Sequence, residues 1–203
     1  MVRAPKRASR AVIDGFLDSK ADWIRRQIDI RKQRMAAPLE YRDGELHYWL
    51  GDQLPLHILP GAVRSPEITL QEGRIRIVTR NTDPDTIKAA LLKWYRRQAN
   101  SFFNNRLEAI ARDIPWLAEM PDLKLRLMRT QWGSCSVKRV ITLNPHLIKA
   151  PPVCIDQVIM HELCHLKEHN HSRRFYRLLE ALAPDHRQIS RQLNEIGDRI
   201  LNV

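Results

Sequence analysis

The spacing of apolar residues along the chain first predicts an amphipathic helix over residues 18–35. Trp23, Ile24 and Ile28 lie on one side of this helix, and arginine and lysine residues occupy the opposite side. From Leu39 to Arg80 the apolar residues instead recur with a period of two, which is typical of strands. Glycine and proline divide that region into four predicted strands: Leu46–Leu50, Leu54–Leu59, Glu67–Gln71 and Arg74–Thr79. The pattern predicts a small antiparallel β meander.

A helical period returns after this region and dominates the rest of the chain. Asp83 or Asp85 can cap a long helix that runs to about Asp113. The remaining predicted elements are two strands, Lys124–Arg129 and Val140–Asn144, and three helices, from Pro151 to about Lys167, Ser172–Leu182 and Asp185–Leu201. This order indicates an α+β fold. We expect a basic helical segment over 1–37, the meander over 38–82 and a core over 83–203, the last two forming one compact unit.

Charge and composition narrow the classes of function. The 203 residues include 34 Lys and Arg against 23 Asp and Glu, which gives a formal net charge of +11. Such a charge attracts polyanions, so the basic helices are candidate contacts for DNA or RNA, although a basic surface can also serve solubility alone. No run approaches the ~20 consecutive apolar residues of a membrane-spanning helix.

The N-terminus and the cysteines bear on the cellular compartment. The first residues are basic, but Asp14 and Asp18 interrupt the only stretch that could serve as the apolar region of a signal peptide. Three cysteines, Cys135, Cys154 and Cys164, are too few and too odd in number for a disulfide framework. We expect a cytoplasmic protein in which they are small, buried residues.

The segment His161-Glu-Leu-Cys-His165 carries the strongest chemical signal. Two histidines four residues apart lie on one face of a helix, so their ring nitrogens can converge on one ion at the ~2.0–2.1 Å that zinc requires. Glu162 can reach a water molecule on that ion and accept its proton, because zinc lowers the pKa of the water towards ~7. The motif is short enough to occur by chance, with two exposed histidines as the alternative. However, its apolar neighbours predict a buried helix, and buried histidines need partners.

A catalytic zinc ion has three protein ligands and one open position, so a third ligand is needed. The candidates are Glu168, His169, His171 and His186. A continuing helix would carry His169 ~12 Å along its axis from His161, which is too far for one ion. Asn170 tolerates the left-handed conformation that ends helices, which would let His171 fold back. We therefore predict one zinc ion per chain, bound by His161, His165 and His171.

These segments resemble a known family of peptidases. The resemblance is carried by Arg129-Thr-Gln-Trp-Gly-Ser-Cys-Ser136, Ile141-Thr-Leu-Asn144, His161-Glu-Leu-Cys-His-Leu-Lys-Glu-His-Asn-His-Ser172 and Phe175. They are similar to the YgjP-like metallopeptidases, relatives of the SprT and WLM zinc peptidases. The resemblance implies a zincin-like core, a zinc ion on the three histidines and Glu162 as the catalytic base. The sequence departs from the family at Pro145-His146, where Trp-Arg is common, and at Tyr176, where Trp is usual.

The residues before the metal motif are candidates for substrate binding. Gly133 permits a tight turn, and Trp132 is large enough to form the wall of a cleft. The resemblance implies that an extended peptide pairs with an edge strand, for which the candidates are Val140, Ile141, Thr142, Leu143 and Asn144. The alternative is an ordinary interior strand. Arg129 could bind an oxyanion or pair with a carboxylate, and both roles stay open.

Two functions compete at this point. The first is a zinc-dependent peptidase acting on protein or peptide substrates. The second is a nucleic-acid-binding module whose zinc site is structural and is closed by a fourth ligand such as His169, Cys135 or Cys164. Glu162 beside an open three-histidine site favours the peptidase. Because the SprT and WLM relatives act on proteins at DNA, the resemblance also implies substrates associated with nucleic acid.

Overall fold

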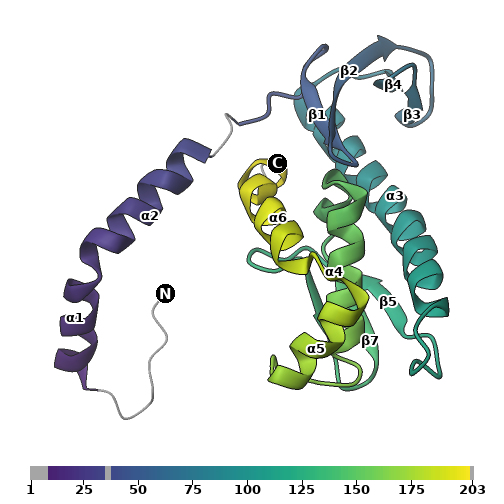
Figure 1. Cartoon of the computed structure of the whole chain (residues 1–203). Helices are drawn as coiled ribbons and strands as arrows, with labels where there is room; N and C mark the ends of the chain where they lie inside the picture. Colours follow the sequence, from purple (N-terminus) through teal and green to yellow (C-terminus); the bar gives the residue numbers. More distant parts are fainter. Residues whose placement is uncertain (1–8, 35–37, 202–203) are drawn as a thin grey trace.

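The computed structural model describes residues 9–34 and 38–201. Within these residues, one long helix, α3 (Pro84–Arg112), connects two small sheets, and three helices follow the second sheet (Figure 1). The α+β class predicted from the order of elements is therefore confirmed. None of the described helices is long and apolar enough to cross a membrane.

The first described segment forms two helices, α1 (Arg10–Ser19) and α2 (Ala21–Arg34). The prediction of a single helix over 18–35 is thus wrong at its start. Ser9 is the N-cap of α1, and its side chain accepts a hydrogen bond from the Val12 backbone N–H at 3.4 Å. Lys20 interrupts the helix with φ −109° and ψ 1°. Met35, where the predicted helix ends, lies outside the described residues.

The first sheet consists of β1 (Leu46–Trp49), β2 (Asp52–Pro60), β3 (Glu67–Gln71) and β4 (Arg74–Thr79). Its order is β1-β2-β4-β3, and β2 pairs with β4 in parallel, so the prediction of an antiparallel meander is wrong. The strands themselves form where the period of two places them. Burial explains the order, because Ile75 and Ile77 of β4 are fully buried while β3 is mostly exposed. The more apolar strand therefore occupies an interior position and β3 an edge.

Helix α3 begins and ends close to its predicted limits. Asp83 is its N-cap and accepts a hydrogen bond from the Asp85 backbone N–H. Its buried face carries Trp94 and Tyr95, which pack against Trp49 of β1 at ring centroid distances of 4.9 and 6.4 Å. At its other end, Arg106 forms two 2.7 Å hydrogen bonds with Asp156 on α4 (Pro152–Cys164). The helix thereby ties the first sheet to the rest of the fold.

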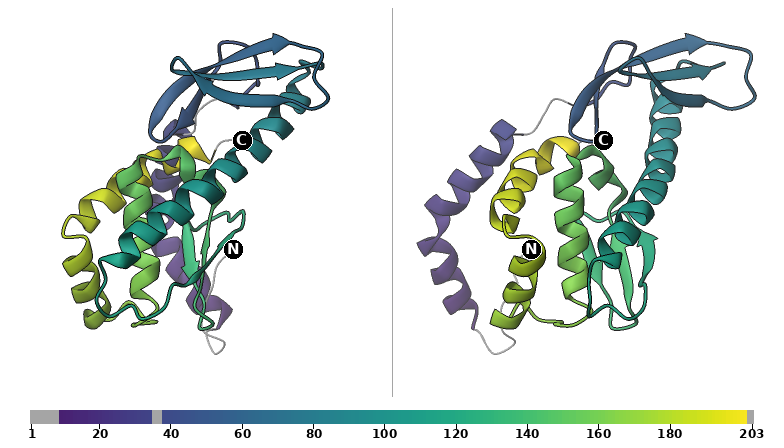
Figure 2. Two further views of the ribbon diagram at one scale, coloured as in Figure 1. Left: turned by 90° about the vertical axis from the view of Figure 1, so that its right-hand side faces the viewer. Right: turned by 45° about the vertical axis from the view of Figure 1, so that its right-hand side comes forward.

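The second sheet consists of β5 (Asp122–Leu125), β6 (Gly133–Cys135) and β7 (Val140–Leu143), and the elements after it are η1 (Pro145–Lys149), α4, α5 (Arg173–Leu182) and α6 (His186–Ile200). β7 is the central strand, with β5 parallel on one side and β6 antiparallel on the other. Helix α4 lies between this sheet and helices α5 and α6 (Figure 2). Helix α6 also contacts α2. One hydrophobic cluster includes buried residues from both sheets and from α3, α4 and α6.

Candidate metal centre

Three histidine rings meet where α4 ends. His161 lies in the last turn of α4 and His165 is its C-cap. The chain then turns back, so that His171 Nε2 lies 3.0 Å from His161 Nε2. Ring nitrogens of all three histidines lie within 4.8 Å of one another. This is the group that the sequence predicts as metal ligands.

The chain reverses by a different route from the one predicted. Helix α4 stops at Cys164, and the backbone N–H groups of Lys167 and Glu168 donate to its carbonyl oxygen at 3.1 and 2.9 Å. Asn170 is not among the described residues with positive φ, so the predicted left-handed cap is wrong. The Ser172 side chain then caps α5, which fixes the direction of the next helix.

Phe175 forms the floor of the histidine cluster. This residue is fully buried, and its ring centroid lies 4.6–4.9 Å from those of His161, His165 and His171. Its contacts restrict the rotamers of all three rings, which reduces the entropy lost when the rings hold an ion. Its position four residues after His171, on the following helix, is the sequence signal for this role.

The charge states of the histidines suit a metal. Burial, followed by the neighbouring histidines, lowers the pKa of His161 to about 4, and burial lowers that of His165. Both rings are therefore neutral at pH 7 and have a lone pair to donate. His165 Nδ1 lies 3.1 Å from the Glu168 carbonyl oxygen, which favours hydrogen on Nδ1 and leaves Nε2 free. These donors fit zinc, which binds neutral imidazole nitrogens.

Glu162 lies beside the cluster in an apolar environment. Its carboxylate is buried, and Oε2 has no hydrogen-bond partner in the described structure. Burial raises the pKa of this carboxyl to about 8. Strand β6 passes very close, because a Cβ atom at Gly133 would lie 2.6 Å from Glu162 Oε1. Only glycine leaves room for the glutamate there, and a buried oxygen without a partner indicates a place for a polar ligand.

A cleft of about 300 Å³ opens over these residues. Trp132, Gly133, His161 and Glu162 lie on its wall, so the structure places Trp132 where the sequence predicts a cleft residue. The other wall is helix α6, whose contributions are Ser190, Leu193 and Asn194. These three residues could not be predicted from the sequence, because nothing in the pattern of α6 distinguishes positions that face the cleft from other positions of the helix.

The prediction that Val140–Asn144 is an edge strand is wrong. Strand β7 has neighbours on both sides, and Ile141, Leu143 and Asn144 are fully buried, whereas Val140 and Thr142 are half-buried. Asn144 instead has a structural role, because its amide donates to the Met128 carbonyl oxygen at 2.8 Å and its backbone N–H donates to that of Trp132. These bonds hold the segment before β6. The edge strand beside Glu162 is β6.

The other candidate ligands lie away from the cluster. Cys164 is fully buried among Phe175, Leu179 and Ala183, and burial raises its pKa to about 12. Burial likewise raises the pKa of Cys135 to about 11. His186 stacks on Tyr176 at 6.2 Å. Cys154 is buried and Arg129 is exposed. Among the described residues, the three histidines have no fourth histidine, cysteine or carboxylate in their group.

Three histidines with converging ring nitrogens beside a buried glutamate are the side chains that a zinc-dependent hydrolase needs. A family model described as YgjP-like, metallopeptidase domain matches residues 1–196. The chain belongs to this family and is a peptide hydrolase.

A search of curated proteins found no match, whereas a search of solved structures found partial similarity to two peptidase zymogens. The metallopeptidase zymogen abylysin of Pyrococcus abyssi shares 25% identity at a TM-score of 0.42, over 48% of this chain and 97% of that one. The zymogen jannalysin of Methanocaldococcus jannaschii shares 19% identity at a TM-score of 0.38, over 48% and 94%.

Proposed function

We propose that the protein is a zinc peptidase in which His161, His165 and His171 hold one ion and Glu162 is the general base. The observation that carries this proposal is the buried Glu162 carboxyl group, whose Oε2 has no partner among the described residues and which lines an open cleft beside the cluster of three histidines. A structural site closed by a fourth ligand is less favoured, because no other ligating side chain joins the triad among the described residues.

The proposed chemistry divides between ion and protein. Zinc bound there would polarise the substrate carbonyl and lower the pKa of a water molecule. Glu162 accepts the proton of that water and delivers it to the leaving amine. Burial raises the pKa of Glu162 when no cation is near. A zinc ion on the histidines would favour the charged carboxylate, which is the form that accepts a proton. The close approach of Gly133 limits the positions that this carboxylate can occupy.

We also propose that β6 binds the substrate backbone. Its outer edge is free in the described structure, and it lies directly over Glu162. An extended peptide added to this edge places its carbonyl groups along the cleft, because strand pairing fixes the register of the backbone. Trp132, at the start of β6, would contact a substrate side chain.

Metal removal tests the proposal. The zinc-loaded chain is expected to hydrolyse an unstructured protein, to lose this activity on treatment with a chelator and to regain it with Zn²⁺ but not with Mg²⁺. The reason is that nitrogen ligands suit zinc, whereas magnesium prefers oxygen. Appearance of new amino groups measures the reaction. Activity that survives complete removal of zinc would contradict the proposal.

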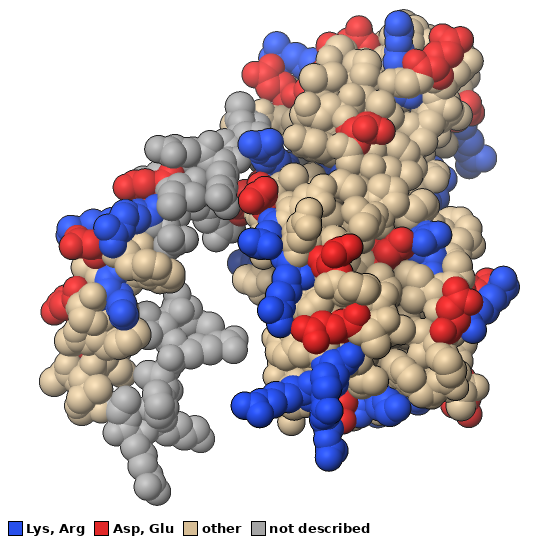
Figure 3. All heavy atoms as spheres, viewed as in Figure 1, with Lys and Arg blue, Asp and Glu red and all other residues tan. Residues whose placement is uncertain are grey.

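Nucleic-acid binding is a second proposal with its own observation. Lys93, Arg96, Arg97 and Asn100 of α3 line a hollow of about 450 Å³ with Leu125. Figure 3 shows a further group of basic side chains over α5, where Arg173, Arg177 and Arg187 border a second hollow together with Glu180, which pairs with Arg187 at 3.0 Å. Arg96 also donates to the Leu125 carbonyl oxygen, which leaves Lys93 and Arg97 as the freer cations. Basic hollows of this kind suit phosphate backbones.

The salt dependence of binding tests this second proposal. The double variant Lys93→Gln/Arg97→Gln is expected to lower the slope of log affinity against log salt by roughly 2 for duplex DNA, at about 0.9 per lost phosphate contact. Arg64→Gln/Arg74→Gln, which removes two exposed arginines near and in the first sheet, is the matched control. If both variants showed the same slope of log affinity against log salt, or if the wild type did not bind at low salt, the proposal would be wrong. The basic residues around the hollow would then serve only solubility.

A further inference from the structure

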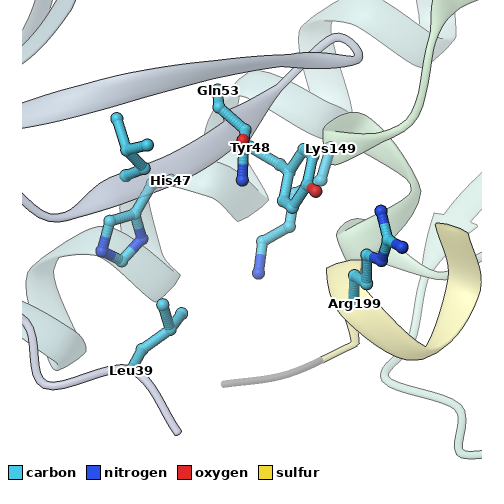
Figure 4. Close-up of a pocket in the computed structure, with 7 residues that line it drawn as sticks. Leu39, His47, Tyr48, Gln53, Lys149 and Arg199 are labelled. Carbon is cyan, nitrogen blue, oxygen red and sulfur yellow. The ribbon is translucent and has the colours of Figure 1, made fainter. Parts of the chain in front are cut away.

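A second pocket lies between the first sheet and the core, away from the metal centre. Its volume is about 300 Å³, and the residues that line it are Leu39, Leu46, His47, Tyr48, Gln53, Lys149 and Arg199. In Figure 4, His47, Tyr48 and Gln53 extend from β1 and β2, whereas Lys149 and Arg199 extend from η1 and α6. Lys149 precedes α4 and His161 lies in its last turn, so roughly 14 Å of helix, from Pro152 to His161, separates the pocket from the metal centre.

Lys149 is the unusual member of this pocket. This residue is only 3% exposed, and its Nζ donates a hydrogen bond to the Ile200 carbonyl oxygen at 3.2 Å. The ammonium also lies 5.0 Å from the centre of the Tyr95 ring. Among the described residues, no carboxylate lines the pocket, and burial alone shifts the pKa of Lys149, without a charged partner. A buried cation without a counter-charge is costly, and none of the described residues supplies one, so an anion in this pocket would stabilise the ammonium.

Arg199 and two uncharged groups add hydrogen-bond donors. Arg199 is exposed, and it has no carboxylate partner in the described part of the chain. The Gln53 amide and the Tyr48 hydroxyl also face this space and can donate. Burial lowers the pKa of His47 although the Glu45 carboxylate lies 2.7 Å from its Nε2, so we count no positive charge on His47. Two cations with two neutral donors around one space match the acceptors of an oxyanion.

We propose that this pocket binds a small oxyanion, either a phosphate-type or a carboxylate group, between Lys149 and Arg199. The bound group neutralises the buried ammonium and bridges elements of the first sheet to η1 and α6. The competing explanation is that Lys149 only caps the carbonyl at the end of α6. In that case Arg199 does not take part in anion binding. Only the proposal therefore predicts that an Arg199 variant binds an oxyanion more weakly than the wild type.

Calorimetric titration of the zinc-loaded full chain tests the proposal. Sulfate represents phosphate-type groups and acetate represents carboxylates, each added against chloride at equal ionic strength. Binding of either probe identifies the source of the oxyanion. Arg199→Gln is expected to weaken that binding by ~10-fold or more, since it removes a charged hydrogen-bonding partner. Arg191→Gln, the same change two turns earlier on α6, is the matched control and should bind as the wild type does.

The pH dependence of sulfate binding provides the second measurement. Burial lowers the pKa of Lys149 to about 8, so affinity should fall as the pH rises through that value. The other groups that face Lys149 do not change their charge near pH 8. Burial lowers the pKa of His47 and His146, so both are already neutral, and burial raises the pKa of Tyr95, which stays neutral. Arg199 stays protonated, as arginines do in proteins. Lys149→Met should abolish the pH dependence. Failure of both probes to bind at about 10 mM, or equal binding by Arg199→Gln and wild type, would overturn the proposal.

Discussion

Replacing Glu162 with glutamine is expected to lower peptide hydrolysis by ~10²–10⁴-fold while the zinc content stays the same. Glutamine has nearly the same size as glutamate and suits a helix equally well, but it cannot accept a proton from water. The buried site tolerates the change, because a neutral amide costs less to desolvate than a carboxylate. Initial rates on an unstructured protein, together with elemental analysis and thermal unfolding, measure the outcome.

Glu168→Gln is the matched control for this variant. Glu168 contacts His165 through its backbone carbonyl oxygen, which the substitution leaves in place, so activity and zinc content should both persist. If Glu162→Gln loses zinc or unfolds, the glutamate holds the site together. A structural role for the metal would then replace the catalytic one.

Replacing His171 with alanine is expected to remove the ion. The variant keeps only two of the three nitrogen ligands, His161 and His165. Loss of a residue that merely hydrogen-bonds to a metal ligand lowers metal affinity by ~10–100-fold, so loss of a ligand itself should lower the affinity for zinc by more. The protein should stay folded, because His171 is exposed and lies outside the main hydrophobic core. Zinc per chain after dialysis against a weak chelator measures the effect.

His169→Ala tests whether the loss is specific to His171. His169 is exposed and lies two residues earlier, outside the group whose nitrogens converge. Its removal should leave zinc stoichiometric. The assignment of His171 would be wrong if His171→Ala retained its zinc and His186→Ala or Glu168→Ala lost it.

Features set by neighbouring residues could be predicted from the sequence, whereas those set by distant contacts could not. The spacing of His161 and His165 predicts their shared helical face, and Asp83 with the apolar period after it predicts α3 almost to the residue. The order of strands in both sheets depends on which strand buries more apolar surface against α3 and α4. No local pattern shows that β2 pairs with β4 or that β7 has neighbours on both sides.

The cleft shows the same division at the level of single residues. Strand β6 has only three residues, too few for a period of two to be recognised, and its importance comes from passing over Glu162. Ser190 and Asn194 reach the cleft because α6 packs on α4, a contact that depends on the whole core. Phe175 could be predicted in part. Its position shortly after His171 associates it with the histidines, but only the fold shows that its ring packs against all three of theirs.

The proposed ligands span residues 161–171, a stretch short enough to come together before the rest of the chain has folded. A partly folded chain could therefore already hold zinc, so the metal would stabilise the native state by less than its full binding free energy. Glu162, in contrast, acquires its apolar surroundings only when Gly133 arrives from another part of the chain. A nascent or heat-damaged molecule could thus carry its metal and still be unable to cut its neighbours.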